Sequence, residues 1–341
     1  MKKLLAKLYG NLAYLRRKLY KAGILKTKKL DIPVISIGNL SVGGTGKTPI
    51  TIETARYFKE KGLKPCVLSR GYKRESKGVV VVSDGENIFT DIKTSGDEPY
   101  LIATHKIPVV VGEDRYEAGL KAIKELSPDL FILDDGFQHY QLERDIDVIV
   151  IDATQPFWKD ELLPLGRLRE PRSFNKYADA FIITKTFLLS EKEKEEFFYY
   201  LDQYTKPYFV AKEKFVRFTD GNLEYNFDIM VNVEVGIFAG LGNNKQFFRY
   251  MLDCADKCGF KIKYTLSFPD HHPYDTLKLP EDVDFWITTY KDFIKLSPDI
   301  IKKYNIVALM YDVELPEDYF RYLEKKLYVR KGFKIPKEDD K

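Results

Sequence analysis

Short apolar runs alternate with stretches of helical spacing from residue 33 to residue 184. This alternation is typical of a parallel β-sheet covered by helices, because each buried strand reads as a continuous apolar run. Segments that begin near residues 50 and 112 have the helical spacing. The predicted strands are residues 33–37, 65–69, 79–82, 107–111, 130–133, 147–152 and 180–184. The fold class expected from this pattern is α/β.

The pattern changes after residue 190, where a charged amphipathic segment precedes alternating apolar and polar residues at 206–218. Gly221-Asn222 predicts a hairpin turn before a strand at 225–227. A second α/β unit then follows, with strands at 235–239, 285–289 and 306–310, a helix to residue 257 and a closing helix at 316–328. We therefore expect a core domain at residues 31–205 and a second, smaller α/β domain at 206–341, joined through the hairpin.

Residues 1–30 contain no acidic residue and many lysines and arginines. Their apolar residues have helical spacing, at Leu4, Leu5, Leu8, Leu12, Leu15, Leu19 and Ile24. The segment has neither an apolar run of about 20 residues that could span a bilayer nor a cleavable signal pattern. A basic amphipathic helix is typical of a segment that lies on an anionic membrane surface. The alternative is a helix that packs on its own domain with its lysines in water.

Length and composition narrow the classes of protein. A chain of 341 residues is long enough for two domains, and 44% apolar with 31% charged residues is ordinary for a globular protein. A net charge of only +4 does not indicate a nucleic-acid-binding protein. Cys66, Cys254 and Cys258 form no CxxC pair, which favours free thiols in a reducing compartment. No protein partner is evident from the sequence.

The segment ISIGNLSVGGTGKTP at residues 35–49 has the strand, glycine-rich loop and helix order of a phosphate-binding P-loop. Glycines let the backbone approach phosphate oxygens closely, and the helix N-terminus favours the same anion. Lys47 would reach the outer phosphates and Thr48 would offer its hydroxyl to Mg²⁺. Ser41 departs from the strict GxxxxGK[ST] spacing. The candidate nucleotide-binding residues are Ser41, Val42, Gly43, Gly44, Thr45, Gly46, Lys47 and Thr48.

The apolar run at residues 130–133 ends in Asp134-Asp135. An acidic residue at the tip of a strand downstream of a P-loop is the Walker B arrangement, in which the carboxylate binds Mg²⁺ or its water shell. Thr48, Asp134 and Asp135 are therefore the candidate metal ligands, and the pattern does not say which of the two aspartates binds directly.

Two further segments carry candidate polar groups. Gly96-Asp97-Glu98-Pro99 reads as a loop, because the proline disfavours a helical conformation at Glu98. Its two acids are metal ligands, a general base or a solvated turn. The loop LLPLGRLREP at residues 162–171 displays Arg167 and Arg169, which suit an anionic substrate or transition-state charge. The alternative is that both arginines are solvated.

The later part of the chain offers a candidate proton relay. Neighbouring histidines are poor joint ligands for one metal, so a relay role for His271 or His272 competes with a plain turn. Thr184-Lys185-Thr186 begins like a guanine-reading NKxD loop, but Phe187 replaces the aspartate. This difference argues against GTP and favours ATP.

Eight blocks of the sequence together resemble the tetraacyldisaccharide 4′-kinase (lipid A 4′-kinase) family. They are GNLSVGGTGKTP, LSRGY, GDEP, LDDGFQH, LLPLGRLREP, AGLGN, DHH and TTYKD, and they run from Gly38 to Asp292. The P-loop with Ser41 is similar to the family's own form. Tyr290 departs from the family, which often has Glu at this position.

The resemblance implies a P-loop NTPase-type sheet and transfer of the ATP γ-phosphate to the 4′-hydroxyl of tetraacyldisaccharide 1-phosphate, in lipid A biosynthesis. It also implies peripheral attachment to the cytoplasmic face of the bacterial inner membrane. Asp97 matches the family's candidate base and His271 its partner, and Arg169 is the candidate for phosphate charge. The competing interpretation is a regulatory P-loop ATPase without a lipid acceptor, in which the GDEP and DHH blocks have no obvious task.

Overall fold

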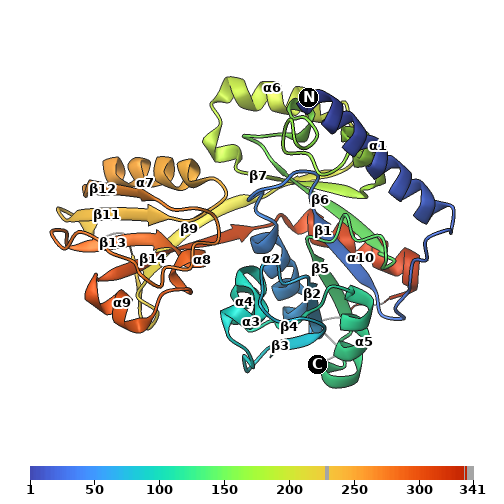
Figure 1. The fold of residues 1–341 in the computed structure, drawn as a ribbon, viewed down its shortest axis with the longest axis horizontal. Coiled ribbons are helices and arrows are strands. Elements are labelled where there is room, and N and C mark those ends of the chain that lie inside the picture. The colour runs from blue at the N-terminus through green and yellow to red at the C-terminus, as the bar shows by residue number, and fades with distance from the viewer. Residues whose placement is uncertain (227–229, 334, 336–341) are drawn as a thin grey trace. The chain divides into compact units, whose positions relative to one another are not determined.

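The structure is a computed structural model that describes residues 1–226, 230–333 and 335. The chain divides into two compact units, the first made of Met1–Glu213 with Val313–Lys341 and the second of Lys214–Asp312 (Figure 1). Each unit has its own sheet and its own core.

The first unit is built on an eight-stranded sheet with the order β3-β4-β2-β5-β1-β6-β7-β8. Its neighbouring strands are parallel except for β3, which is antiparallel to β4. The strands are β1 (Val34–Gly38), β2 (Pro65–Ser69), β3 (Val80–Asp84), β4 (Pro108–Val111), β5 (Leu130–Asp134), β6 (Ile146–Asp152), β7 (Ala180–Thr184) and β8 (Tyr208–Val210). The expected P-loop-type α/β sheet is confirmed.

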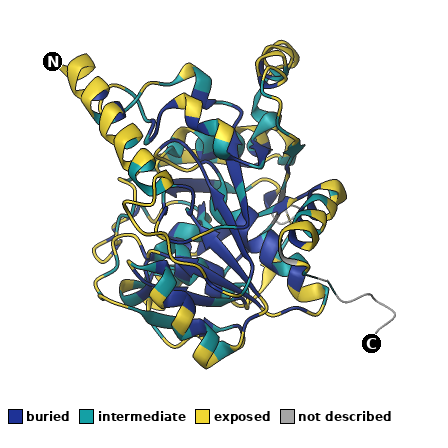
Figure 2. Ribbon diagram, turned by 90° about the vertical axis from the view of Figure 1, so that its right-hand side faces the viewer, coloured by how far each residue is buried: buried dark blue, intermediate teal, exposed yellow. Residues whose placement is uncertain are grey.

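Helices cover this sheet, and its central strands are buried along their length (Figure 2). Burial on both faces explains why β1, β2 and β5 read as unbroken apolar runs. The helices are α1 (Lys2–Lys21), α2 (Lys47–Glu60), α3 (Ile92–Ser95), α4 (Asp97–Thr104), α5 (Arg115–Leu126), α6 (Glu191–Leu201) and α10 (Glu317–Lys331). The described residues of the unit also form 3₁₀ turns at Phe157–Lys159, Arg172–Tyr177 and Thr186–Leu188.

The second unit contains a six-stranded sheet with the order β10-β9-β14-β13-β11-β12. Its elements are β9 (Lys212–Thr219), β10 (Glu224–Tyr225), β11 (Glu234–Ala239), α7 (Asn244–Cys258), β12 (Lys261–Ser267), β13 (Phe285–Thr289), α8 (Tyr290–Phe293), α9 (Pro298–Lys303) and β14 (Ile306–Glu314). Thr219 pairs with Glu224 across the predicted hairpin turn. The predicted strand at 225–227 reaches residue 227, which lies outside the described residues. Strand β12 was not predicted.

The closing helix α10 packs in the first unit, although the sequence pattern assigned residues 206–341 to one second domain. Tyr57 of α2 stacks on Phe320 with ring centroids 3.9 Å apart and donates a 2.7 Å hydrogen bond to Glu324. Tyr319 is fully buried and lies 3.1 Å from the Thr54 hydroxyl. Helix α10 therefore belongs to the first unit because its aromatic side chains pack against α2.

The GDEP segment also differs from expectation, because Asp97 and Glu98 open helix α4 instead of lying in a loop. Pro99 stands in the first turn, where its missing N–H has no intrahelical partner to lose. The two acidic side chains are favourable at this end of a helix. Local helix-start chemistry therefore outweighs the preference of Glu98 for an extended backbone.

Candidate active site

The P-loop and the acidic strand tip lie next to each other because β1 and β5 are neighbouring parallel strands. The register pairs Ile37, at the end of β1, with Asp134, at the end of β5. The loop after Gly38 leads to Gly46, which is the N-cap residue of α2 and has a φ of 87°. Gly43 also has a positive φ, 106°, and no atom lies within 4 Å of a Cβ placed there. The loop therefore has the conformation and the open space that a phosphate needs.

Side chains from outside the P-loop donate hydrogen bonds to its residues. Asn39 Nδ2 donates to Thr45 Oγ1 at 2.9 Å, and Thr184 Oγ1 donates to the Thr45 carbonyl at 2.9 Å. Lys185 Nζ donates to the Gly44 carbonyl at 2.6 Å. These contacts give hydrogen-bond partners to the carbonyls of Gly44 and Thr45. Lys185, in the loop that resembles NKxD, thus has a role that the sequence pattern did not reveal.

The segment that carries Arg169 pairs directly with the P-loop. Val42 N donates to the Arg167 carbonyl at 2.8 Å, and Arg169 N donates to the Leu40 carbonyl at 2.7 Å. A β-bridge joins Ser41 to Leu168 between them. The two arginines then part, because Arg167 makes a 2.8 Å ion pair with Asp160. Of the two predicted arginines, only Arg169 reaches the acidic strand tip.

Two cationic side chains approach the carboxylate of Asp135. Arg169 donates to both of its carboxylate oxygens at 2.7 and 2.6 Å, and Lys47 Nζ lies 3.8 Å from Oδ1. Burial alone would raise the pKa of Asp135, but the charges of Lys47 and Arg169 outweigh burial and hold that pKa below its ordinary value. Lys47, Asp135 and Arg169, predicted from three separate motifs, are brought together.

Asp134 is buried beside Asp135 and accepts a 3.2 Å hydrogen bond from Thr51 Oγ1. Burial raises the pKa of Asp134, and the charge of Asp135 raises it further. Thr51 lies one turn after Thr48 in α2, so its hydroxyl faces the same strand tip. Sequence reasoning missed Thr51, although its spacing of three residues from Thr48 is a usable signal.

The described residues contain no group of three or more His, Cys, Asp and Glu side chains that could hold a metal ion by themselves. The oxygens that the sequence predicts as ligands are the hydroxyl of Thr48 and the carboxylates of Asp134 and Asp135. Two carboxylates at most, completed by phosphate oxygens and water, are the usual ligands of Mg²⁺ in kinase sites. This donor set therefore fits Mg²⁺ bound together with a nucleotide.

The charge of Glu98 contributes to the raised pKa of Asp134. Asp97 precedes Glu98 at the start of α4, where its side chain is partly exposed. Buried Arg115 lies close enough to Asp135 for their charges to interact, and its Nη1 is 3.3 Å from Nδ1 of His139. Burial lowers the pKa of Arg115 to about 10 and that of His139 to about 3, so His139 is neutral at physiological pH.

The two adjacent histidines of the second unit have different surroundings. His272 Nδ1 accepts a 3.1 Å hydrogen bond from the Tyr274 backbone, and its ring packs against those of Phe268 and Tyr274. His271 Nε2 faces Asp270 at 3.7 Å. The structure therefore gives His272 a structural task, and the relay role of His271 stays a prediction. Asp97 belongs to the first unit, so the predicted pairing of Asp97 with His271 stays a prediction.

Comparison with known proteins identifies the family. The family model described as tetraacyldisaccharide-1-P 4'-kinase, LpxK, matches residues 2–328. The chain belongs to the tetraacyldisaccharide-1-P 4'-kinase family. It is similar to the tetraacyldisaccharide 4'-kinase of Aquifex aeolicus, at 42% identity over 94% of this chain and 95% of the relative. The relative of the same name from Halothermothrix orenii is 37% identical, over 92% of this chain and 87% of the relative.

A solved structure extends the agreement to the fold. The crystal structure of the "apo" form of LpxK from Aquifex aeolicus in complex with ATP matches with a TM-score of 0.78 and 40% identity. The match covers 95% of this chain and 96% of that chain. Membership in the tetraacyldisaccharide-1-P 4'-kinase family makes the protein an ATP-dependent kinase of lipid A biosynthesis. The alternative of a regulatory ATPase without a lipid acceptor is therefore not favoured.

Proposed function

We propose that the protein transfers the γ-phosphate of ATP to the 4′-hydroxyl of tetraacyldisaccharide 1-phosphate with the residues grouped at the ends of β1 and β5. Family membership supports the reaction, and the ATP complex of the Aquifex aeolicus structure supports ATP as the phosphate donor. The observation that carries the residue assignment is the convergence of Lys47 and Arg169 on Asp135.

Residues 41–48 bind the phosphates of ATP through backbone N–H groups at the N-terminus of α2. Lys47 binds the outer phosphates, and Arg169 neutralises charge on the transferring phosphoryl group or on the acceptor's phosphate. Phosphoryl transfer passes through a loose transition state, so positioning and charge contribute more than base strength. The hydrogen bonds that hold Thr45 of the P-loop and those that direct Arg169 to Asp135 support this division of roles.

Mg²⁺ is the proposed metal, held by Asp134 or Asp135 together with the hydroxyl of Thr48. When bound, the ion neutralises charge on the phosphate oxygens. The chain prepares this site in two ways. Thr51 orients Asp134 through a hydrogen bond, and the charges of Lys47 and Arg169 hold the pKa of Asp135 below its ordinary value. An ionised Asp135 supplies the hard oxygen ligand that a divalent cation requires.

Asp97 is the proposed base for the acceptor hydroxyl, and His271 is its proposed partner. A free aspartate has a pKa near 3.9 and is a weak base at neutral pH, so a histidine that orients it or accepts the proton onward would help. The position of Asp97 at the start of α4, directly before Glu98, whose charge acts on Asp134, supports this role. His271 Nε2 lies 3.7 Å from a carboxylate oxygen of Asp270, a contact that would orient the imidazole ring.

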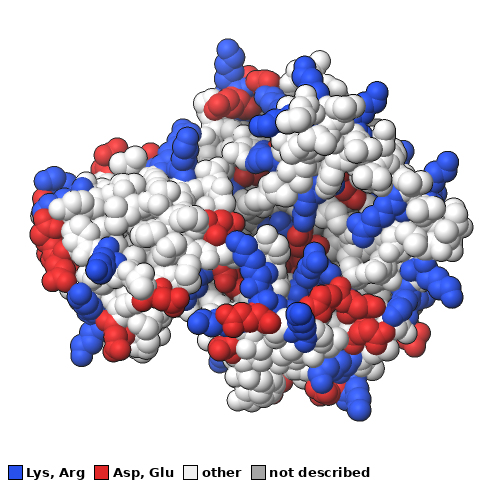
Figure 3. Space-filling model, in the orientation of Figure 1, with Lys and Arg blue, Asp and Glu red and all other residues white. Residues whose placement is uncertain are grey.

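The membrane role of α1 is supported by which side chains it exposes. Leu4, Leu5, Leu8, Leu12 and Leu15 are 46 to 72% exposed, so these five leucines do not pack inward. Lysine and arginine side chains project beside this surface (Figure 3). An exposed leucine face bordered by cations suits an anionic lipid surface.

We propose on this basis that the protein binds the cytoplasmic face of the bacterial inner membrane as a peripheral protein. Within the described part of the chain, no helix combines the length and apolar character needed to cross a bilayer. An acceptor with four acyl chains lies in the membrane itself, so the active site must approach the lipid surface. The exposed leucines of α1 would bring it there.

The experiment that tests the function measures phosphate transfer from ATP with Mg²⁺ to tetraacyldisaccharide 1-phosphate in detergent micelles. The wild type is compared with Lys47→Ala and with Lys59→Ala, which removes a more exposed lysine from the far end of the same helix. We expect a 4′-phosphorylated product with the wild type and Lys59→Ala, and its loss with Lys47→Ala. ATP hydrolysis that is independent of the lipid, without product, would instead indicate a nucleotide-switched ATPase.

A further inference from the structure

Helix α1 packs on the first unit through small residues and a few long polar ones. Ala6 and Gly10 are its buried residues. A Cβ at Gly10 would lie 2.7 Å from Cδ1 of Leu162, so the helix backbone approaches the arginine-bearing loop closely. This approach allows Tyr9 and Arg17, on the same face, to reach residues beside the active site.

Tyr9 holds the backbone of Arg169. Its hydroxyl donates a 2.9 Å hydrogen bond to the Arg169 carbonyl. The backbone N–H of Arg169 donates to the carbonyl of Leu40, which lies between the end of β1 and the glycines of the P-loop. The backbone of Arg169 is thus fixed at two points, one on the P-loop and one on α1.

Arg17 inserts into an aromatic cage. Its guanidinium carbon lies 3.5 Å from the centroid of the Tyr177 ring, 4.7 Å from that of Tyr140 and 5.0 Å from that of Phe174. Its Nη1 donates to the Tyr140 hydroxyl at 2.9 Å. Planar stacking on several rings suits arginine and is not available to lysine.

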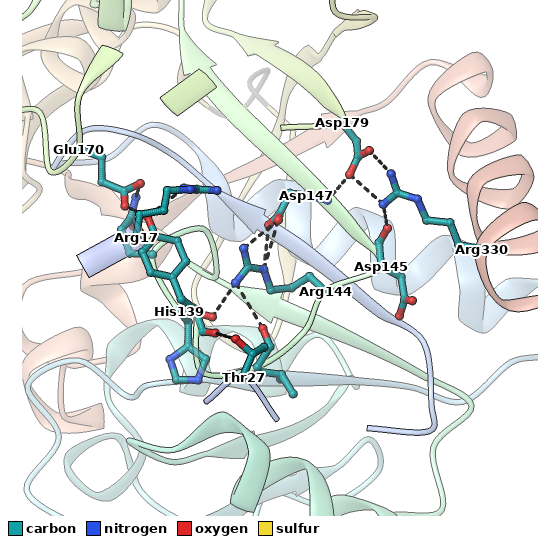
Figure 4. A network of polar contacts seen from close by, with 12 residues as sticks. Arg17, Thr27, His139, Arg144, Asp145, Asp147, Glu170, Asp179 and Arg330 are labelled. Carbon is teal, nitrogen blue, oxygen red and sulfur yellow. Dashed lines mark hydrogen bonds and ion pairs between the residues drawn. The ribbon is translucent and has the colours of Figure 1, made fainter. Parts of the chain in front are cut away.

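The cage connects Arg17 to the residue that follows Arg169. The Tyr140 hydroxyl donates to the carboxylate of Glu170, which is only 3% exposed, and Arg17 lies beside Glu170 (Figure 4). Gln138 Nε2 donates to the same carboxylate at 3.2 Å and to the Asn39 carbonyl at 2.7 Å. Both residues of the pair 169–170 therefore depend on contacts that begin in α1.

We infer that Tyr9 and Arg17 are positioning residues for catalysis, which hold Arg169 and Glu170 in the geometry that directs the Arg169 guanidinium into the active site. Helix α1 then has two faces with two tasks. Its leucine face serves the membrane and its inner face orders the catalytic segment. The inference rests on the proposed role of Arg169, and neither Tyr9 nor Arg17 touches the reacting groups.

The test is a double-mutant cycle with the full chain in detergent micelles, where membrane attachment does not limit the rate. Tyr9→Phe removes one hydroxyl and is compared with Tyr199→Phe, an exposed tyrosine of α6. We expect Tyr9→Phe to lower kcat about 3- to 10-fold, the range for one lost hydrogen bond, with the KM for ATP unchanged. In the Arg169→Ala background, Tyr9→Phe should have no further effect, because it acts through Arg169.

A second pair of variants tests the cage. Arg17→Met should lower kcat by 10-fold or more, whereas Lys192→Met, at an exposed position of α6, should not change it. Both Tyr9→Phe and Arg17→Met should retain binding to anionic vesicles, since the leucine face is intact.

Three results would overturn the inference. One is an equal loss from Tyr9→Phe with and without Arg169, which would indicate general stability only. Another is a loss of activity that parallels a loss of vesicle binding. The third is full activity of Arg169→Ala alone, which would first remove the proposed role of Arg169 and is distinguishable from the other two.

Discussion

Arg169 donates one hydrogen bond to each carboxylate oxygen of Asp135, at N···O distances of 2.7 and 2.6 Å. A two-bond contact of this kind fixes direction as well as distance. Lys47 approaches the same carboxylate from the P-loop. Two cationic side chains of the first unit therefore lie where the negatively charged outer phosphates of a nucleotide would bind.

Replacing Arg169 by lysine should lower kcat/KM roughly 10- to 100-fold, because a single ammonium group cannot reproduce the planar two-bond contact. The measurement is the rate of 4′-phosphate formation with saturating ATP. Arg172→Lys is the matched control, because Arg172 is an exposed arginine of the same segment, paired with Glu161 at 2.8 Å. Unchanged kcat/KM in both Arg169→Lys and Arg169→Ala would remove Arg169 from the site.

Lys47→Ala should lower activity more than Asp97→Ala does. Charge and positioning dominate a loose phosphoryl transfer, so we expect a loss on the order of 10³-fold for Lys47 and about 10²-fold for Asp97. Both variants are assayed side by side for product formation. An equal or greater loss for Asp97→Ala would contradict this order and would make proton removal the larger contribution.

Thr51→Val should raise the Mg²⁺ concentration needed for half-maximal activity about 3- to 10-fold, because buried Asp134 loses a hydrogen bond that orients it. Thr51 is fully buried, so Thr51→Ser, which keeps the hydroxyl, is the matched control. Magnesium titrations of activity compare the two variants. If serine and valine shifted the titration equally, packing and not the hydrogen bond would be responsible.

Glu213→Gln should stabilise the protein at pH 8 and not at pH 5. Burial raises the pKa of Glu213 to about 7, while a hydrogen bond from the Lys185 backbone and the Lys185 charge oppose that rise and nearby Asp152 adds to it. An acid with a raised folded-state pKa stabilises the fold fully below its unfolded pKa of about 4.5 and loses this contribution as pH rises through about 7. The expected gain at pH 8 is on the order of 1–3 kcal/mol.

Urea unfolding of wild type and Glu213→Gln at the two pH values measures this difference. Glu195→Gln, at an exposed position of α6, provides the control for loss of one negative charge. A gain of equal size at pH 5 and pH 8 would show that Glu213 does not titrate in this range.

Leu8→Ser combined with Leu12→Ser should weaken binding to anionic vesicles by roughly 10-fold per leucine, because each side chain loses its transfer into the lipid interface. Both leucines are more than half exposed, so folding should be unaffected. The control combines Leu120→Ser with Leu223→Ser, two exposed leucines elsewhere in the chain. Vesicle flotation of the two double variants gives the comparison. Equal binding by both would argue against α1 as the membrane contact.

Much of the fold was predictable because its signals are local. The apolar runs of the first unit correspond to β1 through β7. A strand that is buried on both faces contains few polar residues and is therefore easy to recognise in the sequence. The P-loop residues and Asp134-Asp135 were recognisable because each motif lies within a few positions along the chain. Strand β12 was missed because its residues 261–267 alternate between exposed and partly buried side chains, with little continuous apolar character.

The sequence by itself determined the α/β class, the family and the separate pieces of the site, because backbone propensity and short-range spacing carry that information. Only the tertiary structure decided which pieces meet. It separated Arg167 from Arg169, returned α10 to the first unit and joined Tyr9 to Arg169 across 160 positions of the chain. Such contacts depend on the order of strands and the packing of side chains between elements, and no local pattern in the chain records them.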